Sequence, residues 1–258
     1  MNPRVCILRT DGTNCDEETA HAFQNAGGTT DLVHVNQLRG QERSLQDYEI
    51  LAIPGGFSYG DDVASGKILA VELITFLEEE LRGFVEKGRP VIGICNGFQV
   101  LVRTGLLPFK TMGKMQATLT HNDSGRFECR WTSLSVSPSP CIFTAGMSHQ
   151  ELSLMVAHGE GKFFSSPETM LRLEEEGLIV LRYIDPRTHL TTEEYPLNPN
   201  GSTYGIAGIC DPTGLIFGLM PHPERFVDIM QHPNWRRFPS APHGLPIFEN
   251  AVRFAKQL

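Results

Sequence analysis

The sequence has little positive charge, no long apolar run and no clustered cysteines. Its 258 residues include 22 lysines and arginines against 30 aspartates and glutamates, which gives a formal net charge of −8. Nucleic-acid binding is therefore disfavoured, and small substrates or protein partners are expected. No apolar stretch approaches the roughly 18 residues that span a bilayer, because the richest one, ILAVELITFLEEEL, is interrupted by acids. A membrane role is not expected.

The cysteines are spread along the chain and form no Cys-x-x-Cys pair. They are Cys6, Cys15, Cys95, Cys129, Cys141 and Cys210. Since no N-terminal stretch resembles a secretory signal, this pattern predicts reduced thiols in a cytoplasmic protein. Internal repeats and low-complexity tracts are also missing, which excludes solenoids and linkers. We expect a single domain over residues 1–258, a length that α/β folds often reach undivided.

Strand and helix patterns alternate over the first hundred residues. Strands are expected at 4–8, 29–35, 48–56 and 89–95, and helices at 12–23, 66–88 and 96–107. Thr13 or Asn14 is expected to cap the first helix. The second helix presents an apolar face made of Leu73, Leu77, Leu81 and Phe84. The alternation predicts a doubly wound, mostly parallel sheet with helices on both faces and ligands at the carboxyl ends of the strands.

The second half of the sequence has strands with short connections. Strand patterns lie at 126–137, 152–159 and 178–184, and a hairpin is expected at 204–225 around the turn Asp211-Pro212-Thr213-Gly214. A final helix is expected at about 246–257, after an irregular Pro-rich segment at 231–246. These strands predict additional antiparallel pairing.

The segment GICNGFQ, residues 93–99, places Cys95 between Gly93 and Gly97 where a strand meets a helix. Flanking glycines allow the tight turn of a nucleophile elbow, which projects the reactive atom above the sheet. The N-terminus of the following helix favours the thiolate form of the cysteine. The alternative is a buried structural cysteine in a glycine-rich turn.

A cysteine nucleophile needs a base and a group that orients the base. The segment MPHPER offers His222 and Glu224, at the end of an apolar strand pattern. A residue before proline is pushed toward extended geometry, so both side chains are expected on the same side of the chain. The alternative is an incidental surface histidine.

Backbone donors for a developing oxyanion are expected at two turns. The N–H groups are those of Asn96, directly after Cys95, and Gly56, whose neighbour Gly55 lets the main chain approach a substrate. Gln99 lies one helical turn after Cys95 and is a candidate substrate contact. The alternatives are an ordinary turn between strand and helix for the glycines and a solvated amide for Gln99.

Six ordered motifs resemble the glutaminase subunits of phosphoribosylformylglycinamidine synthases, a branch of the class I glutamine amidotransferases. They are GTNCDEE (12–18), PGGFSYGDD (54–62), GICNGFQ (93–99), NDSGRFECRW (122–131), VAHGEGKF (156–163) and GICDPTGLIFGLMPHPER (208–225). The resemblance runs nearly end to end and implies a flavodoxin-like fold with one glutamine amidotransferase type 1 domain. It also implies a triad of Cys95, His222 and Glu224 that splits glutamine through a thioester into glutamate and ammonia.

The same resemblance implies roles for the neighbouring residues and for a partner. It places an oxyanion hole on Gly56 and Asn96 and glutamine contacts on Gly55 and Gln99. Ammonia would pass to a large ATP-dependent synthetase subunit that converts formylglycinamide ribonucleotide to the amidine in purine biosynthesis, and a small accessory subunit often joins. ATP and magnesium would belong to the partner, so no cofactor or metal is expected in this chain.

Other motifs have two readings each. Cys15 follows the first strand and is expected to be structural, while His158 either borders the glutamine pocket or is a satisfied loop histidine. Arg126 and Arg130 form either an interface patch or an ordinary exposed strand face. Two other functions remain open from sequence: a non-catalytic binding subunit on the same fold, and another cysteine hydrolase such as a protease or deglycase.

Overall fold

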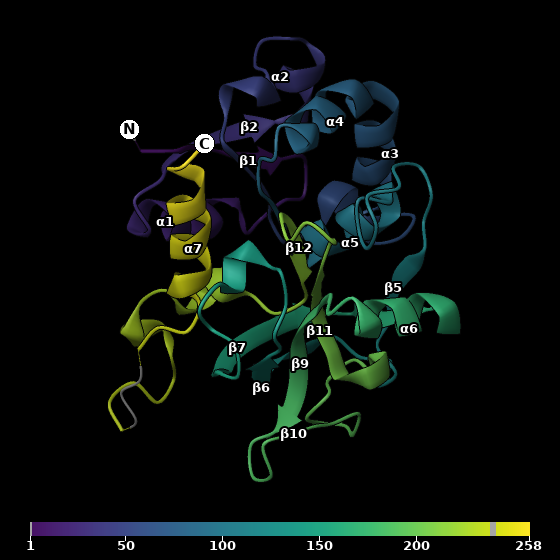
Figure 1. The fold of residues 1–258 in the computed structure, drawn as a ribbon, viewed down its shortest axis with the longest axis vertical. Coiled ribbons are helices and arrows are strands. Elements are labelled where there is room, and N and C mark those ends of the chain that lie inside the picture. Colours follow the sequence, from purple (N-terminus) through teal and green to yellow (C-terminus); the bar gives the residue numbers. More distant parts are fainter. Residues whose placement is uncertain (1, 238–240) are drawn as a thin grey trace.

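A computed structural model describes residues 2–237 and 241–258, and a ten-stranded mixed sheet forms its centre (Figure 1). The strands are β1 (Arg4–Arg9), β2 (Thr29–His34), β3 (Ile50–Ile53), β4 (Val91–Ile94), β5 (Ala117–His121), β6 (Glu128–Val136), β7 (Glu151–His158), β8 (Glu160–Ser165), β9 (Ile179–Asp185), β10 (Leu190–Thr191), β11 (Ile206–Cys210) and β12 (Ile216–Leu219). The order in the main sheet is β2-β1-β3-β4-β12-β11-β9-β6-β7, with β10 paired to β9, while β5 and β8 form a separate pair.

Helices cover both faces of the parallel half of this sheet. The α-helices are α1 (Asp16–Asn25), α2 (Val35–Arg39), α3 (Lys67–Phe76), α4 (Glu78–Glu86), α5 (Asn96–Thr104), α6 (Pro167–Glu175) and α7 (Leu245–Ala255). The short 3-10 helices are η1 (Leu45–Asp47), η2 (Ser58–Asp61), η3 (Ile142–Thr144), η4 (Thr203–Gly205), η5 (Pro223–Phe226) and η6 (Ile229–Gln231). Figure 1 shows α1 and α7 packed together on one side, and α3 and α5 on the other.

The sheet confirms the predicted α/β class with additional antiparallel strands, although its antiparallel part is larger than expected. Strands β2, β1, β3, β4 and β12 run parallel to one another, whereas β12, β11, β9, β6 and β7 pair antiparallel in turn, as β10 does with β9. Every residue of β3, β4 and β12 is buried, as expected for strands covered on both faces. Their short runs of Ile, Leu and Val are typical of such central strands.

The predicted hairpin is present and brings the end of the chain into the middle of the sheet. β11 and β12 pair antiparallel, and β12 then pairs parallel with β4, with Gly218 opposite Gly93 and Leu219 opposite Ile94. Because β4 and β12 run in the same direction, the residues that follow Ile94 and Leu219 leave the sheet at the same edge. This pairing places the segment after residue 94 beside the segment after residue 219.

The predicted 66–88 helix is in fact two helices. Leu77, at φ −126°, leaves the helical conformation between α3 and α4, although its N–H still bonds to Leu73 O and its carbonyl accepts from Leu81 N. The four apolar residues of the predicted face are all buried. The apolar spacing therefore predicted burial correctly, but it does not report whether the backbone bends.

The prediction for the start of the first helix was wrong. Neither Thr13 nor Asn14 caps α1, which begins after Cys15 without a side-chain cap in the described chain. Both polar side chains are engaged elsewhere, since Thr13 Oγ1 accepts from Thr10 N and Asn14 Oδ1 faces the thiol of Cys15. Asp16 in the first turn offsets the missing cap because its charge favours the helix N-terminus.

The irregular segment predicted at 231–246 contains only bends and turns over 232–237 and 243–244, and its residues 238–240 lie outside the described residues. No helix in the described residues is both long enough and apolar enough to cross a membrane.

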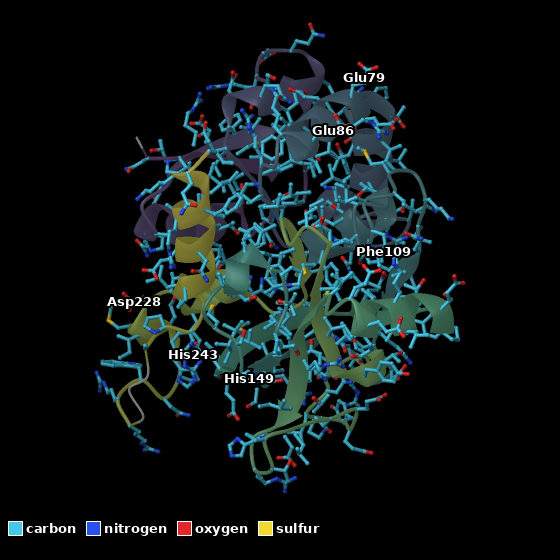
Figure 2. All side chains as sticks on the ribbon, viewed as in Figure 1. Glu79, Glu86, Phe109, His149, Asp228 and His243 are labelled. Carbon is cyan, nitrogen blue, oxygen red and sulfur yellow. The ribbon has the colours of Figure 1, made fainter. Side chains whose placement is uncertain are left out.

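Figure 2 shows the side chains filling the space between sheet and helices, with Glu79 and Glu86 on the outer surface of α4.

Candidate active site

Cys95 occupies a strained turn between β4 and α5. Its φ of 52° and ψ of −104° are unusual for a residue with a side chain, and Cys95 N donates to Leu219 O at 2.8 Å. A Cβ added to Gly97 would lie 1.8 Å from Ile53 O, so only glycine allows α5 to approach β3 this closely. The glycines thus provide the sharp turn that the sequence predicted, and backbone strain of this kind gathers at functional sites.

His222 and Glu224 follow β12 and form a buried hydrogen-bonded pair. His222 Nδ1 lies 2.6 Å from Glu224 Oε1, and the two side chains are 2% and 0% exposed. His222 is extended as predicted, but Glu224 lies in the 3-10 helix η5 rather than in an extended segment. This turn brings the Glu224 carboxylate back toward the imidazole ring of His222. The backbone N–H of His222 donates to Met155 O of β7 at 2.7 Å.

The backbone of Gly55 lies between the cysteine and the histidine. A Cβ built on Gly55 would lie 2.8 Å from His222 Cε1, 3.2 Å from Cys15 Sγ and 3.4 Å from Cys95 Cβ. Three side chains therefore converge on one point that is free only because residue 55 is glycine. Cys95 Sγ lies 3.7 Å from Ala157 O, and His222 Nε2 is buried without a hydrogen-bond partner among the described residues.

The pKa values of the two buried histidines near this site shift in opposite directions. Burial opposes a charge on His222, but the negative charges of Glu224 and of Cys95 raise the pKa of His222 well above its ordinary value of 6.5. Burial, followed by the charge on His222, lowers the pKa of His158 to about 3. The surroundings of His222 therefore favour its protonated form, while His158 stays neutral at physiological pH.

The two expected backbone donors directly follow Gly55 and Cys95 in the sequence. Gly56, at φ +131°, bridges to Thr13, and an added Cβ would lie 2.7 Å from Asn14 N. Asn96 is the first residue of α5, directly after the thiol. The side chain of Asn96 accepts from Ser58 Oγ at 2.7 Å, which fixes the start of the helix.

Gln99 is buried and hydrogen-bonded, so it is not the solvated amide of the alternative reading. Its Nε2 donates to Glu160 O at 2.5 Å, and its Oε1 accepts from Asn96 Nδ2 at 3.1 Å. Asn96 Nδ2 also donates to Asp61 Oδ1 at 3.0 Å. Burial raises the pKa of Asp61, and hydrogen bonds from Ser65, Gly66 and Asn96 oppose that shift.

Two cavities open on either side of a stacked pair of exposed aromatics, Phe57 and Phe127, whose ring centroids are 6.3 Å apart. One cavity, of about 480 Å³, has Asp61, Glu160 and Arg126 in its wall. The smaller, of about 230 Å³, is lined by Asn14, Cys15, Gly56, Phe57, Phe127, Cys129, Ala157, His222 and Arg225. The histidine and the backbone of Gly56 are thus accessible from a cavity.

Cys15 lies inside the cluster, at the edge of the sheet where its place after the first strand allowed it to lie, although a structural role was expected for it. Arg225 Nη2 contacts Cys15 Sγ at 3.3 Å and also pairs with Glu18 at 2.9 Å. Burial raises the pKa of Cys15, while the contact with His222 acts in the opposite direction. The sequence feature that indicates this placement of Cys15 is the position of GTNCD, directly after a strand that ends at the same edge of the sheet as β4.

The remaining motif residues have structural partners. His158 is buried against Asn122, with Nδ1 3.1 Å from Asn122 Oδ1, and it lines neither of the two cavities. Its Nε2 has no hydrogen-bond partner among the described residues, so it is only in part the satisfied histidine of the alternative. Arg126 lines the larger cavity, whereas Arg130 pairs with Glu128 and lies over the ring of Tyr195.

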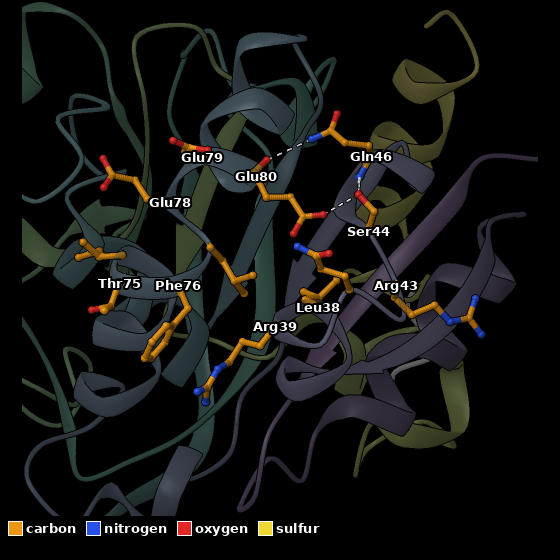
Figure 3. Close-up of a pocket in the computed structure, with 13 residues that line it drawn as sticks. Leu38, Arg39, Arg43, Ser44, Gln46, Thr75, Phe76, Glu78, Glu79 and Glu80 are labelled. Carbon is orange, nitrogen blue, oxygen red and sulfur yellow. Dashed lines mark hydrogen bonds between the residues drawn. The ribbon is translucent and has the colours of Figure 1, made fainter.

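A larger cavity lies elsewhere in the described residues. It has a volume of about 830 Å³ between the α2–η1 connection and the bend of α3 and α4 (Figure 3). Glu80 closes one side of it by accepting from Ser44 Oγ and Leu45 N, and the guanidinium of Arg39 lies 4.1 Å from the ring centre of Phe76. None of the predicted site residues lines this cavity in the described chain, so the volume of a cavity does not by itself identify the active site.

Known proteins similar to this chain share its full length. Residues 2–255 match the family described as the CobB/CobQ-like glutamine amidotransferase domain. The phosphoribosylformylglycinamidine synthase subunit PurQ of Dehalococcoides mccartyi is 49% identical over 99% of this chain and 98% of its own length. That of Treponema denticola is 46% identical over 90% of this chain and 91% of its own.

A solved structure agrees. The structure of PurLQS from Thermotoga maritima includes a chain that superposes with a TM-score of 0.76 at 31% identity, covering 98% of this chain and 99% of that one. The chain therefore belongs to the CobB/CobQ-like glutamine amidotransferase family, among the PurQ subunits of phosphoribosylformylglycinamidine synthase.

Proposed function

We propose that the chain is the glutaminase subunit of a phosphoribosylformylglycinamidine synthase, with Cys95 as nucleophile, His222 as base and Glu224 as the group that orients the base. The residue assignment rests on the buried His222–Glu224 pair, in which His222 Nδ1 lies 2.6 Å from Glu224 Oε1. His222 and Cys95 both adjoin the position that a side chain of Gly55 would occupy. Residues 1–258 would act as one domain. Family membership supports the reaction and removes the unrelated cysteine hydrolase from consideration.

The proposed reaction passes through two tetrahedral intermediates. The Cys95 thiolate attacks the side-chain amide carbon of glutamine, and the electron pair of the C=O bond moves to oxygen. As the C–N bond breaks, His222 gives its Nε2 proton to the departing nitrogen. The products of this step are free ammonia and a glutamyl thioester on Cys95. His222 then takes a proton from water, which attacks the thioester and releases glutamate and the Cys95 thiolate.

Each neighbouring residue has a proposed part in this sequence. Glu224 stabilises the imidazolium and keeps Nε2 directed away from the carboxylate. The N–H groups of Gly56 and Asn96 would stabilise the oxyanion, and the flanking positions Gly55 and Gln99 would contact glutamine. The hydrogen bonds that fix the Gln99 amide support a positioning role, because a fixed amide loses less freedom on binding substrate.

The ammonia would be consumed by a partner. Association with a synthetase subunit is supported by the similarity to a chain of PurLQS. On this proposal, the ATP-dependent synthetase uses ammonia, ATP and magnesium to convert formylglycinamide ribonucleotide to the amidine, and a small accessory subunit takes part. This chain would itself hold neither metal nor cofactor during turnover.

The test is Cys95→Ser in the complex reconstituted with the synthetase. We expect glutamine-dependent turnover to fall by at least about a thousandfold, since removing a nucleophile costs on that order or more. Turnover with added ammonia should be retained, because the synthetase step does not use Cys95. Cys129→Ser, which changes an exposed thiol, serves as the control and should retain both activities. Unchanged use of glutamine by Cys95→Ser would favour the non-catalytic binding subunit.

A further inference from the structure

The larger of the two cavities at the site, of about 480 Å³, holds charged side chains that the reaction above does not use. Its volume lies within about 300–1,000 Å³, the usual range for pockets that bind small molecules. Phe57 and Phe127 line this cavity and also the smaller one that contains His222, so the two cavities adjoin at the aromatic pair. A single small ligand can therefore extend from one cavity into the other.

Two carboxylates in the wall of the larger cavity lack a cationic partner. Asp61 accepts hydrogen bonds only from neutral groups, namely a backbone N–H, a hydroxyl and the amide of Asn96. Glu160 Oε1 lies 3.9 Å from the ring of the exposed His121, and neither carboxylate pairs with a lysine or arginine among the described residues. Burial is the main cause of the raised pKa of Asp61, and the charge of Glu160 acts in the same direction. A positive group near both carboxylates would therefore be stabilised by both.

Arg126 adds the opposite charge to the wall of the same cavity. Its side chain is exposed and forms no ion pair within the part of the chain that the structure describes. The guanidinium is thus not neutralised by Asp61 or Glu160, although all three residues line one cavity. A ligand that carries both an ammonium and a carboxylate group complements this pattern, and a free amino acid is such a ligand.

Hydrogen bonds connect the acidic wall to the helix that begins after Cys95. Asn96 directly follows the thiol, and its Nδ2 donates to Asp61 Oδ1 at 3.0 Å. Gln99 lies about one helical turn further along, and its Nε2 donates to the backbone oxygen of Glu160 at 2.5 Å. The same Nδ2 of Asn96 donates to Gln99 Oε1 at 3.1 Å. This network fixes Asp61 and the backbone of Glu160 relative to the proposed nucleophile.

We propose that the larger cavity binds the α-amino acid end of glutamine, with Asp61 and Glu160 at its ammonium group and Arg126 at its carboxylate group. The inference rests on the proposed function, which brings the amide end of glutamine to the histidine in the neighbouring cavity. The methylene groups of the substrate would then pass beside the aromatic pair that separates the two cavities.

The proposed contacts select free glutamine. A glutamine residue inside a peptide has amide groups in place of the ammonium and the carboxylate, so it would leave Asp61, Glu160 and Arg126 without their partners. Sites that leave charged groups unpaired discriminate strongly against the wrong ligand. The cavity would therefore exclude peptides and accept the free amino acid.

Two analogues that each lack one charged group test the assignment. Glutaramate has no ammonium group, and 4-aminobutanamide has no carboxylate. We would measure kcat/KM for amide hydrolysis of glutamine and of both analogues by the complex reconstituted with the synthetase. Glu160→Gln keeps the backbone bond to Gln99 and should reduce the preference for glutamine over glutaramate by at least about tenfold. Its preference for glutamine over 4-aminobutanamide should stay unchanged.

Arg126→Gln should give the opposite pattern. The preference for glutamine over 4-aminobutanamide should fall by about two- to fivefold, a smaller effect because Arg126 is exposed. The preference over glutaramate should be retained. The controls are Glu79→Gln and Arg82→Gln, which remove exposed charges from α4 and should leave both preferences as they are in the parent.

An equal loss with all three substrates would assign Glu160 a structural role and overturn the proposal, as would unchanged preferences in Glu160→Gln and Arg126→Gln. Calorimetric binding of the same three compounds to the full chain with Cys95→Ser repeats the comparison without turnover. If the parent complex does not hydrolyse glutamine and this variant does not bind it, the proposed function itself fails. If glutamine is used but the variants keep the preferences of the parent, only the assignment of the larger cavity fails.

Discussion

At the scale of single residues, the site depends on where buried charge is placed. The sequence predicted that Cys95, His222 and Glu224 would lie together, because each stands in a motif whose chemistry requires that residue type. It also allowed Cys15 to lie near the same edge of the sheet. It did not predict that Cys15 approaches His222, since residues 15 and 222 are separated by most of the chain and meet across the missing side chain of Gly55. The burial of Gln99 could not be predicted either, because it depends on hydrogen-bond partners, such as Glu160, that no local sequence pattern identifies.

Glu224→Gln tests the electrostatic part of this arrangement. The amide keeps the size of the side chain and removes the negative charge that raises the pKa of His222. We expect kcat with glutamine to fall on the order of 10²- to 10⁴-fold with little change in KM, because the imidazolium of the transition state loses its stabilising partner. Steady-state kinetics of the complex measure this. A loss confined to KM would assign Glu224 to substrate binding instead.

His158 should make folding sensitive to acid. Its pKa is about 3 in the folded chain and about 6.5 when unfolded, so between these values the unfolded state binds the extra proton. The free energy of unfolding should therefore fall as pH decreases from 6.5 toward 3, by up to about 1.4 kcal/mol per pH unit. Urea unfolding at several pH values measures this slope.

The variant His158→Gln should flatten that slope, whereas His121→Gln, which changes an exposed histidine, should leave it unchanged. The comparison depends on the slope and not on the absolute stability, which loss of the contact with Asn122 also lowers. Equal slopes in all three proteins would show that other groups cause the acid sensitivity.

At the scale of elements, apolar periodicity identified the strands of the parallel half and the hairpin, but it did not identify backbone details. The break at Leu77 keeps all four residues of the predicted apolar face buried, so the pattern is the same with or without it. The pair β5–β8 and the helix α6 were not predicted. α6 has a recognisable start, with Ser166 as the cap and Pro167 in the first turn.

The packing of α5 onto β3 is tested by adding a single methyl group. In Gly97→Ala the new Cβ would meet Ile53 O at 1.8 Å, so we expect a loss of about 1–3 kcal/mol in the free energy of unfolding and a displaced Cys95 turn. The better helix propensity of alanine offsets only about 0.5–1 kcal/mol of this cost. Chemical denaturation and glutamine turnover measure the two effects.

Gly83→Ala in α4 is the matched control. Its added Cβ would be 3.6 Å from Gln46 Nε2, an ordinary contact, so the helix propensity alone decides the result. We expect a gain of about 0.5–1 kcal/mol. If Gly97→Ala were as stable as Gly83→Ala, the close approach of α5 to β3 would not matter for folding.

At the scale of the whole molecule, the alternation of strands and helices predicted the fold class but not the strand order. β12 could pair with β4 only by inserting between β4 and β11, and such long-range pairing leaves no local mark in the sequence. His222 N donates to Met155 O of β7, and this hydrogen bond also connects the antiparallel half of the sheet to the site. Both contacts depend on global topology.

Assembly with the synthetase should accelerate glutamine hydrolysis. Phe57 and Phe127 lie exposed between the two cavities of the site, so a partner that covers them would also act on the residues that line both cavities. We expect kcat/KM for glutamine to rise by about 5- to 150-fold on assembly, the usual range of coupling between two sites. Glutamate release by the chain alone and in the complex measures this. A free chain as fast as the complex would contradict it.

The central position of β12, the last strand among the described residues, also bears on protein synthesis. A growing polypeptide exposes Cys95 long before the ribosome adds His222, so the sulfur first emerges without its base. The middle of the sheet stays open until this late segment inserts. On the proposed chemistry, a translation product that stops before His222 would release no ammonia, and catalytic competence would arrive only after this residue has been added.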